Sequence, residues 1–186
     1  MKLFTIVLSL VTLATSTLAI ASSVEVKAVG TLNFSTLSLG VSNSALESIS
    51  RFGFGVLASL DVVPLSLETG LLFTPVGIGS GSQSLWTNYL QIPLLATYKA
   101  HIFSAGLGPY LGLGVGSGTN IANVTSKNLR TDFGLMAKAG VNVPVAPLVG
   151  LVGEAAYQFG LTNISNGMVT ANARNFMILA GVSFGF

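Results

Sequence analysis

Hydrophobic and polar residues alternate along most of this chain with a period of two, the spacing of side chains on the two faces of a β-strand. The alternation is clearest near the C-terminus, where one face carries Phe176, Ile178, Ala180, Val182, Phe184 and Phe186. The other face of this segment is small or mixed, so the pattern predicts a strand with one face in an apolar medium. An exposed aromatic strand is rare in a soluble domain because it would be a sticky edge. The edge strand of a soluble β-sandwich is the competing interpretation.

The same alternation predicts eight strands, each with the roughly nine to eleven residues that a tilted strand needs to cross a bilayer. The predicted strands cover residues 24–35, 52–62, 65–74, 86–98, 102–114, 130–143, 148–164 and 174–186. Between them lie three tight turns, at residues 63–64, 99–101 and 144–147, and four longer polar loops, at residues 36–51, 75–85, 115–129 and 165–173. This alternation is typical of an all-β, antiparallel, up-and-down transmembrane barrel with the tight turns and both termini on the periplasmic side.

Transmembrane helices are the alternative, because residues 69–98 and 102–126 carry no formal charge. The second of these stretches contains Pro109 and six glycines, at positions 106, 108, 112, 114, 116 and 118. In a helix interior each Gly costs about 1 kcal/mol and a Pro about 3 kcal/mol, so the stretch would form a very poor helix. Only helices and closed barrels satisfy all backbone groups in lipid, and excluding helices therefore leaves a β-barrel.

Composition supports a surface that meets lipid. Only 8% of the residues are charged, against about 25% in ordinary globular proteins, and the mean hydropathy is +0.75. The formal net charge is +2 and no basic patch accompanies it, so nucleic-acid binding is not expected. Cysteine is absent, so disulfides contribute nothing to stability.

The N-terminal residues have the pattern of a secretory signal peptide: a basic start, an apolar run and the small-residue exit Ala19-Ile20-Ala21. We expect cleavage after Ala21, with residues 1–21 as signal peptide and residues 22–186 as one barrel domain. An N-terminal membrane anchor is less well supported, because Ser and Thr dilute the apolar run and no basic cluster follows it.

Nearly every charged residue in the predicted strands falls on the face opposite the apolar row. A lipid-facing charge near the bilayer midplane costs about 2–4 kcal/mol, so we expect these side chains to point into the lumen and pair there. The expected lumen network comprises Glu25, Lys27, Glu68, Arg130, Asp132, Lys138 and Glu154. An eight-stranded interior is just wide enough for side chains to fill. Inward-facing glycines such as Gly55 and Gly181 leave space, and they favour a narrow channel as the competing interpretation.

Several motifs resemble those of porin-family outer-membrane β-barrel proteins of Gram-negative bacteria. Residues 88–95 read NYLQIPLL, 108–112 read GPYLG, 132–134 read DFG, 160–164 read GLTNI, and 27–35 (KAVGTLNFS) resemble an early strand of the family with its glycine one place late. The resemblance implies an integral barrel in outer-membrane lipid that the barrel-assembly machinery inserts. Phe184 and Phe186 at the end of the last strand resemble the assembly signal of such barrels. The resemblance implies neither a defined activity nor an open pore.

Other candidate sites have structural interpretations. Phe34, Phe52, Trp86 and Tyr89 lie beside the longer loops, where we expect them to anchor the barrel in the outer leaflet; a carbohydrate platform is the alternative. The only histidine, His101, falls in a predicted periplasmic turn, so neither a catalytic nucleophile–His–acid arrangement nor a metal site is expected. The glycine-rich residues 77–82 lack the Lys-Ser/Thr of a phosphate-binding loop.

The sequence thus predicts a monomeric, non-enzymatic outer-membrane barrel that has a filled polar lumen and needs no cofactor. Its role would lie in membrane integrity or in surface contacts made by four extracellular loops, with an unidentified ligand. A narrow channel for small solutes or ions is the alternative function.

Overall fold

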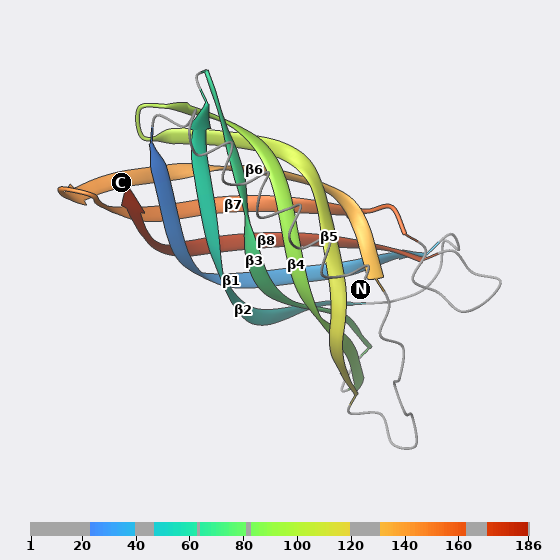
Figure 1. The fold of residues 1–186 in the computed structure, drawn as a ribbon. Coiled ribbons are helices and arrows are strands. Elements are labelled where there is room, and N and C mark those ends of the chain that lie inside the picture. Colours follow the sequence, from blue (N-terminus) through green and yellow to red (C-terminus); the bar gives the residue numbers. More distant parts are fainter. Residues whose placement is uncertain are drawn as a thin grey trace, which may run out of the picture.

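Eight antiparallel strands follow one another around a closed barrel, and β8 pairs with β1 to complete it (Figure 1). The strands are β1 (Val24–Leu39), β2 (Glu47–Val62), β3 (Leu65–Ser80), β4 (Gln83–Ala100), β5 (Phe103–Thr119), β6 (Thr131–Ala146), β7 (Val149–Gly160) and β8 (Ala171–Gly185). The computed structural model describes residues 23–39, 47–62, 64–80, 83–119, 131–162 and 171–185. The predicted all-β up-and-down barrel is therefore confirmed.

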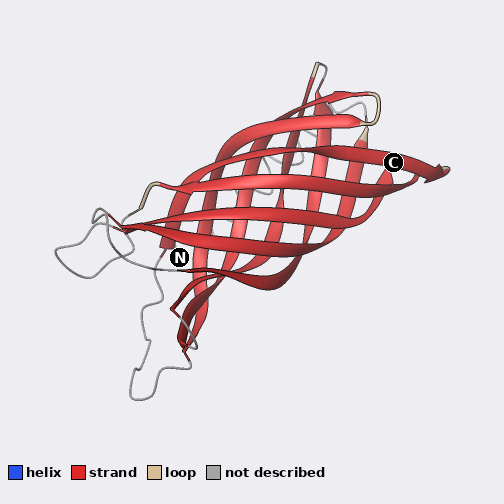
Figure 2. Cartoon of the chain, turned by 180° about the vertical axis from the view of Figure 1, so that it is seen from behind, coloured by secondary structure: helices blue, strands red, loops and turns tan. Residues whose placement is uncertain are grey.

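Strands are the only regular secondary structure in the described residues (Figure 2). These residues contain no helix that is long and apolar enough to cross a membrane. The seam between the first and last strands is continuous, from the pair Glu25–Gly185 to the pair Leu39–Ala171. Arg130, Phe186 and the predicted signal peptide lie outside the described residues.

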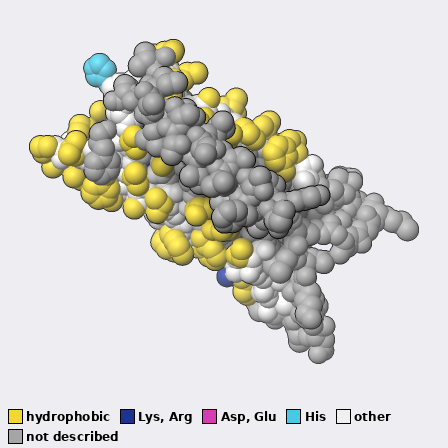
Figure 3. Space-filling model, in the orientation of Figure 1, with side chains coloured by type: hydrophobic (Ala, Val, Ile, Leu, Met, Phe, Trp, Pro, Cys, Tyr) yellow, Lys and Arg dark blue, Asp and Glu magenta, His cyan; other side chains and the backbone are white. Residues whose placement is uncertain are grey.

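Successive side chains in the barrel wall point alternately into the lumen and outward, with the period of two. On β6, Asp132, Met136 and Lys138 are buried inside, whereas Phe133 and Leu135 are about half exposed on the outer face. Hydrophobic side chains form most of the described surface in Figure 3, where no acidic side chain is visible. An exposed apolar surface of this extent is typical of a barrel that faces lipid.

Several predicted loop residues belong to strands instead. Residues 36–39, 47–51, 75–80 and 115–119 continue the ladders of β1, β2, β3 and β5. The prediction was wrong there because these segments are rich in Ser and Gly and lack an apolar row, while backbone pairing does not require one. At their loop ends β3 to β5 bend away from β1 and from β6 to β8 (Figures 1 and 2), whereas β2 stays paired with β1 as far as Ile49.

Two turns and one strand end also differ from the prediction. β6 continues to Ala146 before a turn at residues 147–148, and β4 continues to Ala100 before a turn at residues 101–102. His101 and Leu148 have φ of 56° and 65°, a conformation common in the two-residue turns of hairpins. β7 ends at Gly160 rather than at residue 164.

The inward glycines do not leave open space. A Cβ added to Gly181 would lie 2.8 Å from Cα of Val29, its partner on β1, and one added to Gly55 would lie 2.5 Å from Cδ2 of Leu72, its partner on β3. Glycine at such positions lets a strand bend sharply while its neighbour approaches closely. The expected open space at these glycines is therefore not found, since the adjacent strands fill it.

Candidate functional site

Four charged side chains from four strands meet inside the barrel. Lys27 of β1 places Nζ 2.9 Å from Oε2 of Glu68 on β3 and 2.8 Å from Oε1 of Glu154 on β7. Lys138 of β6 places Nζ 2.9 Å from Oε2 of Glu154 and also pairs with Glu68. Each ammonium thus contacts both carboxylates, and all four side chains are fully buried. We call Lys27, Glu68, Lys138 and Glu154 the charge ring.

The charge ring has no net charge, which is what makes its burial tolerable. An isolated ion in the barrel interior would lose several kcal/mol of hydration, and removing one partner of a buried pair costs about 3–5 kcal/mol. The backbone also makes room for the ring: Gly140 is the partner of Glu154 on β6, and a Cβ there would lie 2.6 Å from Cγ of Glu154. A larger residue at position 140 would displace this carboxylate.

An apolar layer lies next to the charge ring on its loop side. Its buried members are Val29, Leu57, Leu72, Leu95, Tyr110, Met136, Ala156, Met177 and Leu179. Val29, Met136 and Ala156 are each two positions from a charge-ring residue on the same strand, so they point into the lumen one step farther along it. The predicted filled polar lumen therefore needs correction, because one layer of it is apolar. Apolar side chains fill a narrow interior without needing hydrogen-bond partners.

Beyond the apolar layer the interior becomes polar again. Gln91 and Gln158 exchange hydrogen bonds through their amides, with Gln158 Nε2 donating over 2.6 Å, and Asn175 donates to Gln158 Oε1 over 3.2 Å. Farther toward the loops, Asp132 accepts hydrogen bonds from Tyr110 Oη (2.7 Å) and Thr162 Oγ1 (2.6 Å). Asp132 thus lies in the lumen but apart from the charge ring.

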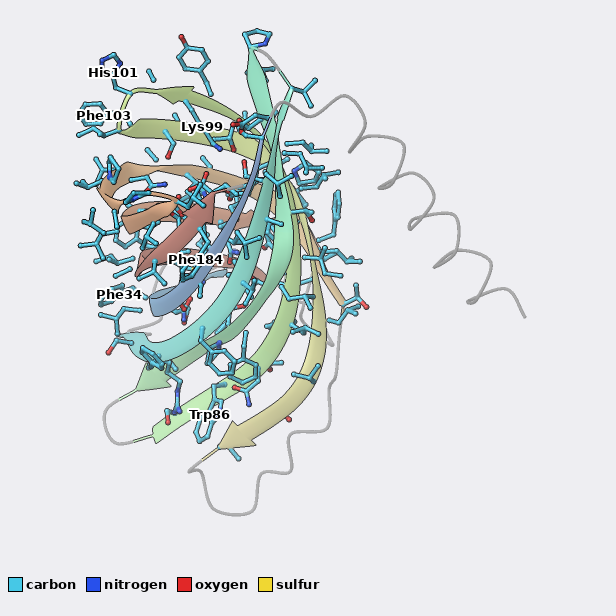
Figure 4. All side chains as sticks on the ribbon, turned by 60° about the vertical axis from the view of Figure 1, so that its left-hand side comes forward. Phe34, Trp86, Lys99, His101, Phe103 and Phe184 are labelled. Atoms are coloured by element: carbon cyan, nitrogen blue, oxygen red, sulfur yellow. The ribbon has the colours of Figure 1, made fainter. Side chains whose placement is uncertain are left out.

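A second set of ionic contacts lies at the turn end of the lumen. Lys99 Nζ is 2.8 Å from Oε2 of Glu25 and 2.8 Å from Oδ1 of Asp61, and Asn142 donates to Oε1 of Glu25. These four residues, the mouth network, line a cavity of about 330 Å³ that also reaches Lys27. Figure 4 shows Lys99, His101 and Phe103 at this end. Glu25 therefore pairs at the mouth and not with the charge ring.

Sequence reasoning missed two members of the mouth network. Lys99 was assigned to a turn, although it shares its face of β4 with the buried Gln91 and Leu95. Asp61 shares its face of β2 with the buried Leu57 and Ser59. The period of two was thus the available signal, and it was lost because both residues lie close to strand ends.

The expected aromatic anchors occupy different environments. Phe34 is exposed on the outer face and packs on Phe176 with ring centroids 6.2 Å apart, and Phe52 is 66% exposed. Trp86 is half-buried at the loop end (Figure 4). Cζ of Arg51 lies 3.7 Å from the centroid of its ring. Tyr89 needs correction: it is buried beside Val76 inside the barrel, because it shares its face of β4 with Gln91. Phe184 is 41% exposed on the outer face at the turn end.

Most of the charged and polar side chains described in the interior pair with one another. Charges of opposite sign neutralise one another in the charge ring. Beyond the apolar layer Gln91, Gln158, Asn175 and Asp132 each form at least one hydrogen bond, and Asn175 Oδ1 has no partner among the described residues. In the described parts of the chain, no group of three or more His, Cys, Asp or Glu residues could hold a metal ion.

Comparisons with known proteins agree with the fold. The model of a family described as "Outer membrane protein beta-barrel domain" matches residues 5–186. The structure is similar to OprG of Pseudomonas aeruginosa (14% identity, TM-score 0.57, covering 89% of this chain and 96% of that one). It is also similar to Neisserial surface protein A (18% identity, TM-score 0.57, covering 89% of this chain and 99% of that one). A third similar structure is Ail of Yersinia pestis in complex with the heparin analogue sucrose octasulfate (15% identity, TM-score 0.50, covering 87% of this chain and 99% of that one). No curated protein matches the sequence. At such identities the structural likeness shows the fold alone.

Proposed function

This chain belongs to the family of outer membrane protein beta-barrel domains, and from that premise we propose that it is a closed, non-enzymatic barrel. Its body would reinforce the outer membrane of a Gram-negative bacterium, and its four longer loops would make contacts at the cell surface. The protein would act as a monomer and without a cofactor. Its residues 1–21 would be removed on export, and the barrel-assembly machinery would insert the remaining chain.

The stacking of the charge ring against the apolar layer carries this proposal. An ion that crosses the lumen must separate ion pairs that are fully buried, and it then meets Leu57, Leu95 and their apolar neighbours without a hydration shell. The first step costs several kcal/mol per pair, and an apolar constriction excludes ions by dewetting. Two barriers of different chemistry thus lie in series.

The orientation follows from the unequal ends of the barrel. Short turns are periplasmic and longer loops extracellular in outer-membrane barrels. The mouth network and both chain termini would therefore face the periplasm. Exposed aromatic residues lie at both ends, with Tyr98 and Phe103 at the turn end and Phe34 and Phe176 at the loop end. Such rows mark the two membrane interfaces.

Single-channel recording of the refolded protein in a planar bilayer tests the proposal. We expect no reproducible conductance step above the bilayer baseline. The competing function is a narrow channel for small solutes or ions, which the mouth cavity favours because it leads from the turn end to Lys27. Uniform, lasting, ion-selective steps from the unmodified protein would establish the channel and reject the closed barrel.

A further inference from the structure

The mouth network carries an excess of negative charge. Glu25 and Asp61 contribute two carboxylates, Lys99 contributes one ammonium, and Asn142 is uncharged. The neighbouring charge ring does not supply the missing positive charge, because its two lysines are matched by its two glutamates. Among the residues that the structure describes, the turn end of the lumen is therefore short of one cation.

The cavity beside the mouth network has room for a further cationic group, with a volume of about 330 Å³. The charged and titratable groups that line it in the described chain come from β1, β2, β4 and the turn after β4: Glu25, Lys27, Asp61, Lys99 and His101. Its other lining residues are uncharged. Lys27 already pairs within the charge ring, so an additional cation in this cavity would meet the two mouth carboxylates.

Ser23, the first described residue, is attached directly to the mouth network. Its Oγ donates a hydrogen bond to Oδ2 of Asp61 over 2.5 Å, and its carbonyl oxygen accepts one from the backbone amide of Asp61 over 3.1 Å. These contacts fix both the backbone and the side chain of Ser23 beside the carboxylate. Covalent geometry then keeps the backbone nitrogen of residue 22 within about 5 Å of Cα of Ser23. A charge on that nitrogen would lie at the mouth.

We propose that the mouth network binds the α-ammonium group of Ser22, which removal of the signal peptide after Ala21 creates. The mature chain then supplies the positive charge that the network lacks. In the precursor the same nitrogen is an uncharged amide, because residues 1–21 continue from it. Cleavage thus completes the ionic contacts between β1, β2 and β4 at the turn end. This inference rests on the cleavage site proposed above.

The spacing of the two mouth carboxylates favours a second cation. Lys99 Nζ is 2.8 Å from an oxygen of Glu25 and 2.8 Å from an oxygen of Asp61, so the two carboxylates are close enough to repel each other. An ionised carboxylate also offers about four acceptor sites, and within the described chain Glu25 accepts from Lys99 and Asn142. A second ammonium relieves the repulsion. Its effect is modest, because solvent reaches the mouth and screens the charges.

The pH profile of α-amine acylation tests the proposal. The mature chain beginning at Ser22 is refolded in detergent micelles, acylated between about pH 6 and pH 9, and its N-terminal peptide is quantified by mass spectrometry. Only the uncharged amine reacts, so a carboxylate that stabilises the ammonium shifts the whole profile to higher pH. Simple shielding of the amine would instead slow the reaction at every pH. We expect the reaction at pH 7 to be about three- to fivefold slower than in D61N. D132N removes a carboxylate far from the mouth and should react as the unmodified protein does.

A second measurement separates the charge of the N-terminus from its position. Acetylation of Ser22 removes the charge and keeps the chain length, whereas a four-residue extension before Ser22 keeps the charge and moves it away. We expect both changes to lower the urea midpoint at pH 7 by a similar amount, and neither to lower it in D61N. The difference between the unmodified and acetylated chains should vanish as the pH rises through the titration of the amine, because the ammonium stabilises the fold only while it is protonated.

Three results would overturn the proposal: the same acylation profile for the unmodified protein and D61N, equal urea midpoints for the unmodified and acetylated chains at pH 7, or a first residue other than Ser22 in protein purified from outer membranes. The last result, read by N-terminal sequencing, would reject the proposed cleavage site. The first two are measured on a chain with a defined start, so they would reject the ammonium site and leave the cleavage site intact. The two failures are thus distinguishable.

Discussion

Lys27 of β1 and Glu154 of β7 form a 2.8 Å ion pair although 127 positions separate them in the sequence. β8 lies between their strands in the wall, so the two side chains meet only because both point into the lumen. The contact links the N-terminal strand to the C-terminal half of the barrel. Closing the barrel therefore brings the partners of the charge ring together.

Replacing Glu154 with alanine should strongly destabilise the barrel. The change leaves Lys27 and Lys138 to share Glu68 as their only described carboxylate partner. We expect a loss of about 3–5 kcal/mol in the free energy of unfolding, measured as a lower urea midpoint in lipid vesicles. Glu25→Ala is the matched control, because the mouth is partly exposed and Lys99 keeps Asp61 as a partner. Equal midpoints for the two variants would show that the charge ring does not hold the barrel together.

Opening the charge ring alone should not make the barrel conduct, because the apolar layer remains beside it. We expect Glu154→Ala to give no conductance steps in planar bilayers. Adding Leu57→Ser and Leu95→Ser should produce them, since both leucines are fully buried in the apolar layer. Folding of each variant is checked by its heat-dependent shift on a gel. Steps from Glu154→Ala alone would mean that the charge ring is the only barrier.

A methyl group at Gly181 should be costly. Its Cβ would lie 2.8 Å from Cα of Val29, so β8 and β1 would have to separate at the seam. We expect Gly181→Ala to lower stability by about 1–3 kcal/mol. At Gly153 the nearest atom to an added Cβ is Cγ2 of Val141 at 3.8 Å, so Gly153→Ala serves as the control and should be tolerated. Similar urea midpoints for both variants would contradict the close approach at the seam.

The end of β8 should govern insertion of the protein. Phe184 is exposed on the outer face and is paired with Val26 on β1 and Val149 on β7. We expect Phe184→Ser, or deletion of Phe186, to reduce the amount of folded barrel in the outer membrane severalfold, with the remainder aggregated in the periplasm. Phe103→Ser removes an even more exposed aromatic ring (62% against 41%) at the same end but on β5. A similar loss for Phe103→Ser would make the effect one of general hydrophobicity.

Cysteine labelling tests the proposed orientation, since the chain has no cysteine of its own. His101→Cys places a thiol in the turn between β4 and β5, and Val115→Cys places one near the loop end of β5. A membrane-impermeant maleimide should label position 115 in intact cells. It should label position 101 only after the outer membrane is permeabilised. The reverse pattern would place the turn end at the cell surface.

The alternation of residue types was sufficient to determine the wall of this barrel. Lys138 and Phe133 lie five positions apart on β6, so the period of two alone places them on opposite faces. The low content of charged residues and the high content of apolar residues then identify the outer face as lipid-facing. The same local signal failed at Tyr89 and Lys99, where the face was readable but proximity to a strand end suggested another role.

The contacts inside the barrel were decided only by the tertiary structure. The period of two predicts that Lys27, Asp132 and Glu154 point inward. It gives no information about the level along the barrel axis, or depth, at which each side chain lies. Depth depends on the tilt of the strands and on the stagger between neighbours, which close contacts at residues such as Gly55 and Gly181 help to set. Stagger accumulates around the wall, so Glu154 reaches Lys27 while Asp132 lies beyond the apolar layer. Which inward residues meet is therefore a property of the closed barrel and not of any single strand.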